Sequence, residues 1–524
     1  MIGWIGNTNL DPFKTADGTR YVAPFGQYMN ELLDERSKLY AESFDAVVLV
    51  LDGEEFLERF RSEAVEELRH VLSAVRQFLC AKPGSVFIMS NIALPPGSVL
   101  TYLDANSASG ASNLEDLLNR EIKRLCAEYP NFLVLDWKRL VRLHGYYALV
   151  SDKFSYLGRI RWTQEGFSAL SKESERLLNA YRGKSRKVLA VDLDNVLWGG
   201  VVGEAGREGI LLSEEDLGRA YRDFQKHLKA LKRTGVLLVI VSRNNEADVE
   251  EAFGHPMMAL APGDFVSRRI NWKDKAENLA DIARELGLGL DAFVFLDDSP
   301  VERQRMRETL PQVAVPEFPS DAAELKRWFL EDVVYAHFAR TSLTSEDIQR
   351  SGSYVREAGR KQAAGKLDAA SFLEMLRIRL TPHVNDAEQS ARVAQLTQRT
   401  NQFNLTTRRY DEHAVGGLMR SKDTVVLTLD YEDKFGKEGT VAAAIVKVSG
   451  AEAALDVFLL SCRVIGRRVE HALLTEIEGA LRGHGVRTLK AEFIPTAKNA
   501  VCAGFLEEAG FSRGPGKDHE KKIS

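Results

Sequence analysis

The chain has 524 residues, of which 44% are hydrophobic and 28% are charged. This length and composition exclude a single small module and a wholly disordered chain, and they indicate about three globular domains. Lysine and arginine together number 70 and aspartate and glutamate 75, so the formal net charge of −5 offers no general attraction for nucleic acid.

The four cysteines are too few for a disulfide scaffold and lack the C-x-x-C spacing typical of zinc sites. The N-terminal residues lack the basic region and continuous apolar stretch of a signal peptide, and no run of about 18 apolar residues occurs. We therefore expect a cytoplasmic protein in a reducing compartment, with neither a membrane nor a nucleic acid as its partner.

Residues 1–182 form the first predicted domain. Apolar runs typical of buried strands alternate with helical stretches, which is the pattern of a doubly wound α/β layer. The expected strands are 44–51, 85–89 and 132–135, with helices at 54–80 and 113–129. A short basic segment at 181–187 marks the boundary with the next domain.

Residues 183–340 continue the α/β alternation and predict a second parallel sheet. Its expected strands are 188–194, 236–242 and 292–298, and its expected helices are 220–233, 246–253 and 275–286. Ligands of such sheets bind at the carboxyl ends of the strands, so the polar residues that directly follow these runs are the candidate site.

The remainder of the chain predicts a different architecture. Residues 341–369 are charged and poor in apolar residues, which indicates a helical linker. Residues 370–516 predict an α+β domain with an antiparallel pair at 424–430 and 440–448, strands at 454–462 and 488–493, and helices at 387–397, 466–481 and 497–509. Residues 517–524 are expected to be a polar, solvated tail.

Two acidic pairs follow predicted strands of the second sheet. Asp192 and Asp194 lie two residues apart at the end of one strand, so in an extended backbone both side chains leave the same face. Asp297 and Asp298 end another strand. Like charges this close are unfavourable without a cation or a proton between them, and grouped carboxylate oxygens suit Mg²⁺ that shares its coordination with a substrate phosphate. These four aspartates are the predicted metal site.

Further polar residues complete a predicted phosphoryl-binding site. Ser242 directly follows a strand, and Arg243 and Asn244 come next in a loop whose backbone N–H groups favour anions. Lys275, at the start of a helix, supplies an ammonium group, although Lys273 lies close enough in sequence to compete with it. A hydroxyl, a loop of N–H groups and an ammonium would together bind phosphoryl oxygens.

The order of these pieces resembles the haloacid dehalogenase (HAD) superfamily, with D-x-D at the first strand, serine at the second, then lysine, then an acidic pair. The resemblance implies that Asp192 is the nucleophile that becomes an aspartyl phosphate and that Asp194 is the general acid/base. It also implies Mg²⁺ bound by Asp192, the backbone carbonyl of Asp194 and Asp298, with Asp297 nearby, and phosphoryl oxygens held by Ser242 and Lys275.

A basic turn lies in the predicted α+β domain. Residues 459–470 read LLSCRVIGRRVE, where a strand ends and a helix begins. N–H groups at a helix start and guanidinium ions favour an anionic group, and the predicted binding residues are Arg463, Gly466, Arg467 and Arg468. The segment resembles the acyl-CoA-binding turn of GNAT acyltransferases, except that Arg468 stands where a small residue is expected, which disfavours ordinary coenzyme A binding.

Seven motifs together resemble the FkbH-like family: DLDNVLWGGVVGE, VSRNN, NWKDKAENL, FVFLDDSPVER, LTQRTNQFNLTTRRY, SCRVIGRRVE and PTAKN. The resemblance covers about residues 187–511 and implies a glyceryl transferase/phosphatase. Such an enzyme takes a small phosphorylated three-carbon substrate, 1,3-bisphosphoglycerate, and delivers a glyceryl thioester to the phosphopantetheine arm of an acyl carrier protein in polyketide or tetronate assembly. Residues 1–182 more weakly resemble an SGNH-hydrolase layer that lacks its Gly-Asp-Ser nucleophile block, so we expect them to be inert or to bind a partner.

Cys462 is the predicted acyl carrier within the protein. It precedes Arg463 at the expected strand end, where cations and a helix start favour the reactive thiolate. The alternative is a small buried hydrophobic residue, the usual role of a lone cysteine. Two other functions stay open: a HAD phosphatase of another small phosphometabolite fused to an acyl-CoA-dependent acyltransferase, and a HAD core flanked by non-catalytic carrier-protein docking domains.

Overall fold

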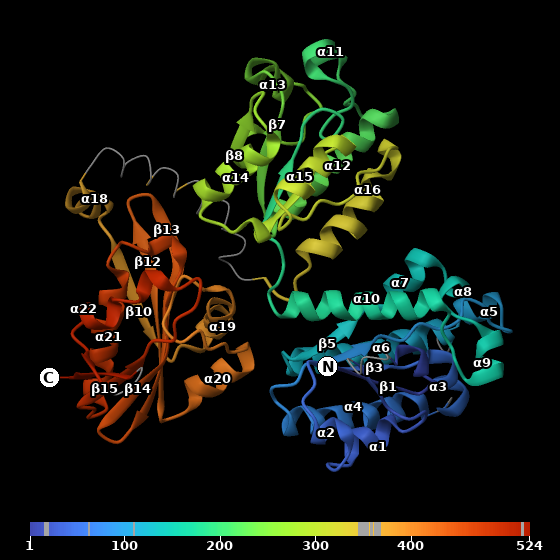
Figure 1. Ribbon diagram of the computed structural model, residues 1–524. Helices are drawn as coiled ribbons and strands as arrows, with labels where there is room; N and C mark the ends of the chain where they lie inside the picture. The colour runs from blue at the N-terminus through green and yellow to red at the C-terminus, as the bar shows by residue number, and fades with distance from the viewer. Residues whose placement is uncertain are drawn as a thin grey trace. The chain divides into compact units, whose positions relative to one another are not determined.

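The computed structural model describes residues 1–14, 20–60, 63–107, 110–343, 356, 360, 368–514 and 518–523. The chain divides into two compact units, Met1–Tyr181 and Arg182–Ser524, and the second unit contains two separate sheets (Figure 1). Most of the linker expected over 341–369 lies outside the described residues.

The first unit is built on a five-stranded parallel sheet in the order β2-β1-β3-β4-β5. The strands are β1 (Ile2–Gly6), β2 (Arg20–Val22), β3 (Ala46–Val50), β4 (Phe87–Ser90) and β5 (Phe132–Leu135). The helices are α1 (Tyr28–Leu33), α2 (Lys38–Ala41), α3 (Gly53–Phe60), α4 (Ala64–Ala81), α5 (Tyr102–Ala105), α6 (Ala111–Glu128), α7 (Trp137–His144), α8 (Tyr146–Leu149), α9 (Asp152–Gly158) and α10 (Gln164–Tyr181). Alternate residues of β3 belong to two different apolar cores, Val47 to one and Val48 to the other, so both faces of the sheet are covered. The predicted α/β layer is confirmed.

Two strands of this sheet lie outside the sequence prediction. β1 reads IGWIG, so it lacks the continuous apolar run by which β3 is recognised in the sequence. It nevertheless lies between β2 and β3 in the sheet. A Cβ on Gly6 would sit 2.5 Å from the Val50 carbonyl oxygen, so the close approach of the two strands requires glycine there. The single helix predicted over 54–80 is instead two helices, α3 and α4.

The central sheet has four parallel strands in the order β8-β7-β6-β9. The strands are β6 (Val188–Val191), β7 (Leu237–Ser242), β8 (Phe265–Ile270) and β9 (Phe293–Leu296), and the helices are α11 (Val202–Gly209), α12 (Asp216–Arg233), α13 (Glu246–Phe253), α14 (Lys275–Leu286), α15 (Pro300–Thr309), α16 (Leu325–Trp328) and the π-helix η6 (Phe329–Phe338). The three predicted strands are confirmed. The additional edge strand β8 reads FVSRRI, which is half polar and only partly buried. Because β6 lies between β7 and β9, residues that follow β6 are flanked by the loops after both neighbours.

The C-terminal sheet runs in the order β10-β12-β13-β14-β15-β17-β16, and β11 pairs with β14. The strands are β10 (Arg379–Val384), β11 (Phe403–Asn404), β12 (Thr424–Asp433), β13 (Gly436–Ser449), β14 (Glu452–Leu460), β15 (Thr488–Glu492), β16 (Ser512–Arg513) and β17 (Asp518–Lys522), and the helices are α18 (Ala369–Leu376), α19 (Ser390–Arg399), α20 (Glu412–Arg420), α21 (Val469–Gly483) and α22 (Phe505–Glu508). Helix α21 contributes to the core on one face of this sheet, and α19 and α20 contribute to the core on the other. The predicted α+β architecture and its antiparallel pair, β12 with β13, are confirmed. The helix predicted over 497–509 is wrong, because only short helical turns such as α22 form there.

The polar tail expected at the C-terminus is also wrong. Residues Asp518–Lys522 form β17, which lies between β15 and β16 and pairs antiparallel with both. Ladder hydrogen bonds come from the backbone and need no apolar side chain, and Lys521 pairs with Glu478 at 2.7 Å, so a charged sequence enters the sheet. Ile523 is only 9% exposed and packs in the core of this sheet.

Across the described ranges, we find no helix that combines the length and the apolar character needed to cross a bilayer.

We predict that Ile523→Ala lowers the free energy of unfolding of the C-terminal domain by about 2 kcal/mol, because the substitution leaves a cavity in a packed core. Lys522→Ala is the matched control, since Lys522 is exposed on the same strand. Calorimetric unfolding of the two variants and the parent chain measures the difference. Equal stability of all three would contradict the burial of Ile523 and favour the solvated tail.

Candidate active site

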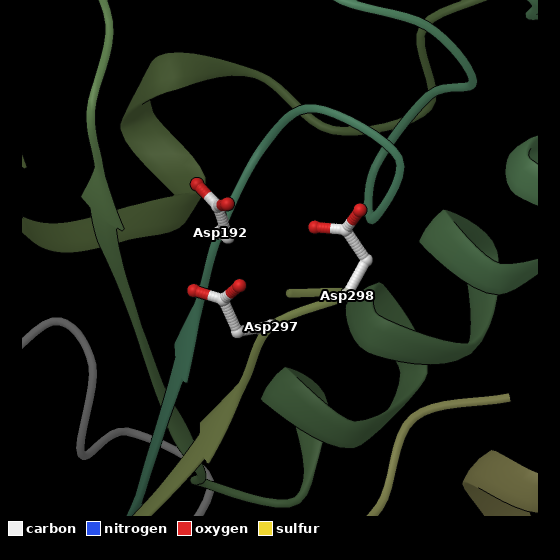
Figure 2. Close-up of side chains that lie close together, drawn as sticks. All are labelled: Asp192, Asp297 and Asp298. Carbon is white, nitrogen blue, oxygen red and sulfur yellow. The ribbon is translucent and has the colours of Figure 1, made fainter. Parts of the chain in front are cut away.

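Two neighbouring strands of the central sheet bring three aspartates together. Asp192 follows β6 and Asp297 and Asp298 follow β9, and these strands pair in parallel with Val191 opposite Leu296. The Asp192 backbone N–H donates to the Leu296 carbonyl at 3.0 Å, which extends the pairing to the site. One carboxylate oxygen of each aspartate lies within 4.8 Å of the others. Figure 2 shows the three side chains together beyond the strand ends.

Lys275 supplies the buried cation of this cluster. Its Nζ donates to Asp192 Oδ2 at 2.8 Å and to Asp297 Oδ2 at 2.6 Å, and its side chain is only 6% exposed. The preceding Asp274 caps helix α14 by accepting from the Ala276 and Glu277 N–H groups, which fixes the helix turn that carries Lys275. Lys273 is exposed, so the structure places Lys275 and not Lys273 against the aspartates.

The electrostatics of the cluster favour an additional positive charge. Burial and the negative charge of Asp192 raise the pKa of Asp297 to about 7, against the opposing effect of Lys275. Burial and Asp192 also raise the pKa of Asp298. Burial alone would lower the pKa of Lys275, but the carboxylates of Asp192 and Asp297 outweigh it and the pKa is raised. One ammonium binds two of the three carboxyl groups, Asp192 and Asp297, so the negative charge is only partly compensated.

The cluster fits a hard divalent cation such as Mg²⁺. Asp192 Oδ2 accepts from Lys275, whereas Asp192 Oδ1 is buried and has no hydrogen-bond partner among the described residues. A buried carboxylate oxygen without a partner is unfavourable, and Mg²⁺ prefers oxygen ligands of this kind. The residues able to hold the ion through their carboxylates are Asp192, Asp297 and Asp298.

The carboxylate of Asp194, a fourth predicted metal residue, is bound elsewhere. Its Oδ1 accepts from Trp198 Nε1 at 2.9 Å and from the Val202 N–H at 3.0 Å, and its Oδ2 accepts from Asn244 Nδ2 at 3.0 Å. The Asp194 carboxylate is therefore not part of the cluster, and the metal role of its backbone carbonyl that the HAD resemblance implies stays a prediction. The three donors hold the carboxylate in one orientation, which a general acid/base requires.

The predicted phosphate-binding residues after β7 have several different partners. Ser242 is buried at the strand end, and its hydroxyl accepts from Asn244 Nδ2 at 3.2 Å. Asn244 thus links Ser242 to Asp194. Arg243 pairs with Glu302 of α15 at 2.6 Å, so its charge is already compensated at the edge of the site. Phosphate binding by Ser242, Arg243, Asn244 and Lys275 stays a prediction.

Sequence reasoning missed Arg303, which shapes this site, and for Trp198 it left open a turn over the phosphate site or plain packing. Trp198 is fully buried, and its indole donor fixes Asp194, whereas the sequence alone does not distinguish it from packing. Arg303 is 7% exposed, and its Nη1 donates to the carbonyls of Asp297 at 2.9 Å and Asp298 at 2.7 Å. The sequence signal for Arg303 is its place one turn into a helix that begins at Pro300, directly after the acidic pair.

The turn that carries Cys462 is present, but two of its arginines face inward. Strand β14 ends at Leu460, and Cys462 is an exposed residue in a single 3₁₀ turn, Cys462–Val464. Arg463 Nη1 donates to Glu438 Oε2 at 3.1 Å, and Arg467 lies against the Tyr431 ring with its guanidinium carbon 5.5 Å from the centroid. Arg463 and Arg467 are therefore bound within the domain, and their predicted acyl or carrier binding stays a prediction.

Gly466 and Arg468 shape the same turn through their backbones. Both have positive φ, 79° and 59°, and helix α21 begins directly after Arg468. Glycine adopts this conformation readily, whereas arginine does so only under constraint from its surroundings. Arg468 is exposed and thus accessible to a ligand, but the predicted acyl or carrier binding by Gly466 and Arg468 is not tested by this geometry.

Neither a search of protein-family models nor one of curated proteins finds a match for the chain. Among solved structures, the chain is similar to the N-terminal part of the protein BF1531 from Bacteroides fragilis, which contains a phosphatase domain complexed with Mg. The identity is 27% and the TM-score 0.58, over 63% of this chain and 92% of that one.

Two further solved structures are acetyltransferases that each match 28% of this chain. One is the ribosomal-protein-S18-alanine N-acetyltransferase of Escherichia coli, with 19% identity, 95% of its chain covered and a TM-score of 0.23. The other is the GNAT domain of S. lividans PAT, with 20% identity, 94% of its chain covered and a TM-score of 0.23. The match to BF1531, which extends over more of the chain than any one of its three predicted domains, supports a HAD-type phosphatase domain around the aspartate cluster.

Proposed function

We propose that the protein is a glyceryl transferase/phosphatase of the FkbH-like type. It takes 1,3-bisphosphoglycerate, removes phosphate at the Asp192 site and loads a glyceryl thioester onto an acyl carrier protein for polyketide or tetronate biosynthesis. The observation that carries the proposal is the convergence of Asp192, Asp297 and Asp298 with Lys275, where the buried Asp192 Oδ1 has no hydrogen-bond partner among the residues that the structure describes. The wider resemblance of the chain to the FkbH-like family supplies the substrate and the partner.

The phosphatase half of the reaction uses Asp192 and Asp194. A carboxylate oxygen of Asp192 attacks the phosphorus, a new O–P bond forms, and the bond from phosphorus to the ester oxygen breaks. Asp194 gives a proton to the departing oxygen and later takes one from water, whose oxygen displaces Asp192 and releases phosphate. Mg²⁺, held by Asp192, Asp298 and the Asp194 carbonyl with Asp297 nearby, would supply charge neutralisation for the phosphoryl group.

The acyl half uses Cys462. Its thiolate attacks the carbonyl carbon of the acyl phosphate, a C–S bond forms, and the C–O bond to phosphate breaks with phosphate as the leaving group. The thiolate of the phosphopantetheine arm then takes the glyceryl group and restores Cys462. Cys462 is exposed two residues after the end of β14, which supports this role over the alternative of a buried hydrophobic residue.

We predict that Mg²⁺ binds about tenfold more weakly at pH 6 than at pH 8. Asp297 has a folded-state pKa of about 7 against an ordinary 3.8, so below pH 7 a proton occupies the carboxyl group and competes with the cation. Because the folded state holds this proton more tightly than the unfolded state, Asp297 contributes fully to the free energy of unfolding of the metal-free protein below about pH 4. That contribution is lost as the pH rises through 7. Titration calorimetry with Mg²⁺ alone, in buffers of different ionisation enthalpy, measures the affinity and the proton release. Equal affinities at the two pH values would contradict this account.

We predict that Asp192→Asn lowers phosphate release by at least about a thousandfold, because the amide cannot form the aspartyl phosphate. Release of inorganic phosphate from a simple phosphate monoester measures the effect, because the Cys462 step releases phosphate only from an acyl phosphate. Glu277→Gln is the matched control, since Glu277 is an exposed carboxylate on α14, two residues after Lys275. Undiminished phosphate release by a folded Asp192→Asn variant would rule out Asp192 as the nucleophile.

We predict that Cys462→Ala abolishes glyceryl transfer to the carrier protein while at least part of the phosphate release is retained. Intact-protein mass of both partners, after mixing with 1,3-bisphosphoglycerate, detects the glyceryl adduct. Cys126→Ala is the control, because Cys126 is also an exposed thiol. Delivery that survives Cys462→Ala would favour the reading of the terminal domains as non-catalytic docking modules.

A further inference from the structure

A buried ion cluster lies beneath the turn that carries Cys462. Two carboxylates belong to it, Asp433 at the end of β12 and Glu438 near the start of β13, and their residues are 6% and 2% exposed. Carboxylates this deeply buried require cations and hydrogen-bond donors around them. We call this group the Glu438 cluster, and its members are Arg356, whose Nε donates to Glu438 Oε1 at 3.0 Å, and Arg360, Tyr431, Asp433, Glu438, Arg463 and Arg467.

The central cation of the cluster is Arg360, from the segment expected to be a linker. Arg360 is 1% exposed. Its Nε and Nη2 donate to the two oxygens of Asp433 at 2.7 and 2.9 Å, and its Nη1 donates to Glu438 Oε1 at 2.8 Å. Burial would lower the pKa of Arg360, but the two carboxylates outweigh it and the pKa is raised. A two-pronged contact of this kind fixes both position and orientation.

Glu438 connects Arg360 to the start of the Cys462 turn. Its Oε1 accepts from Arg360, and its Oε2 accepts from Arg463 Nη1 at 3.1 Å. Arg463 directly follows Cys462, and its Nε also donates to Ser461 Oγ at 3.2 Å, on the other side of the cysteine. The residues on both sides of Cys462 are therefore tied to one buried carboxylate.

Asp433 holds the other end of the turn through Tyr431. The Tyr431 hydroxyl donates to Asp433 Oδ2 at 2.9 Å. Arg467 stacks on the Tyr431 ring, and its Nη1 donates to the Tyr431 hydroxyl at 3.4 Å. Since Arg360 binds Asp433 and Glu438 together, it lies where the restraints on both ends of the turn meet.

We propose that Arg360 and Glu438 are positioning residues for Cys462, so that Arg360, which precedes the C-terminal domain in sequence, supports the acyl-transfer site. The catalytic consequence rests on the proposed role of Cys462. The structural consequence does not, because it concerns the order of the 461–468 turn in the protein without substrate. Connecting segments that only tether domains have no need of a buried arginine with two carboxylate partners.

Hydrogen exchange of the full-length protein tests the structural consequence. We expect amides of the 461–468 turn to exchange at least about tenfold faster in Glu438→Gln and in Arg360→Met, with the central sheet unchanged. Arg360→Met removes the cation that Asp433 and Glu438 share, and this variant is the one at risk of not folding. Glu438→Gln keeps the Arg360–Asp433 pair, so it tests the proposal in that case. Arg420→Gln, an exposed arginine on α20, is the matched control. Unchanged exchange of the turn in a folded Glu438→Gln variant would overturn the proposal.

Steady-state transfer to the carrier protein tests the catalytic consequence. We expect Glu438→Gln to lower kcat for glyceryl thioester formation at least about tenfold with KM for the carrier protein unchanged, and Arg360→Lys to retain more activity than Arg360→Met. Phosphate release at the Asp192 site should be unaffected. A faster-exchanging turn with unchanged kcat would overturn the positioning role. If the unmodified protein forms no glyceryl thioester at all, the proposed function fails, and the exchange result stands independently.

Discussion

Three carboxyl groups lie at the ends of two adjacent parallel strands with a single buried ammonium bound to two of them, and the chemistry of the central sheet depends on that imbalance. Parallel register alone places Asp192 beside Asp297, because the residues before them pair across β6 and β9. Lys275 compensates part of the charge, and one oxygen of Asp192 is left without a partner among the described residues. Binding a cation would lower the free energy of this aspartate cluster. The apolar cores on both faces of the sheet hold the cluster in place.

The Glu438 cluster shows the opposite electrostatic outcome. There the buried carboxylates of Asp433 and Glu438 meet the guanidinium groups of Arg360 and Arg463 in close hydrogen-bonded contacts. Its charges are satisfied by the chain itself, which makes it suited to holding a turn and not to binding an ion. The two clusters illustrate how similar residue types give a binding site in one case and a structural support in the other, according to whether an oxygen is left open.

The sequence predicted the central site well because its information is local. Each aspartate directly follows an apolar run, and parallel sheets bring such positions to one edge. The partners of Asp194 were not predictable in the same way, since Asn244 lies fifty residues away and only the fold brings them within 3.0 Å. The internal partners of the basic turn around Cys462 were not predictable for a related reason, because Glu438 and Tyr431, which bind Arg463 and Arg467, are distant in sequence. β1 and β17 were missed because glycine and charged residues conceal strands whose pairing is made by the backbone.

The bond from the Trp198 indole to Asp194 has one more consequence. A fully buried indole whose N–H contacts a carboxylate is an optical probe placed one hydrogen bond from the group proposed to carry the proton. A proton that Asp194 gives or takes in the proposed reaction would change the local field on that ring, and so the emission of this tryptophan, one of six in the chain. The proposed acid/base step would then be visible in the intrinsic fluorescence, with no label attached.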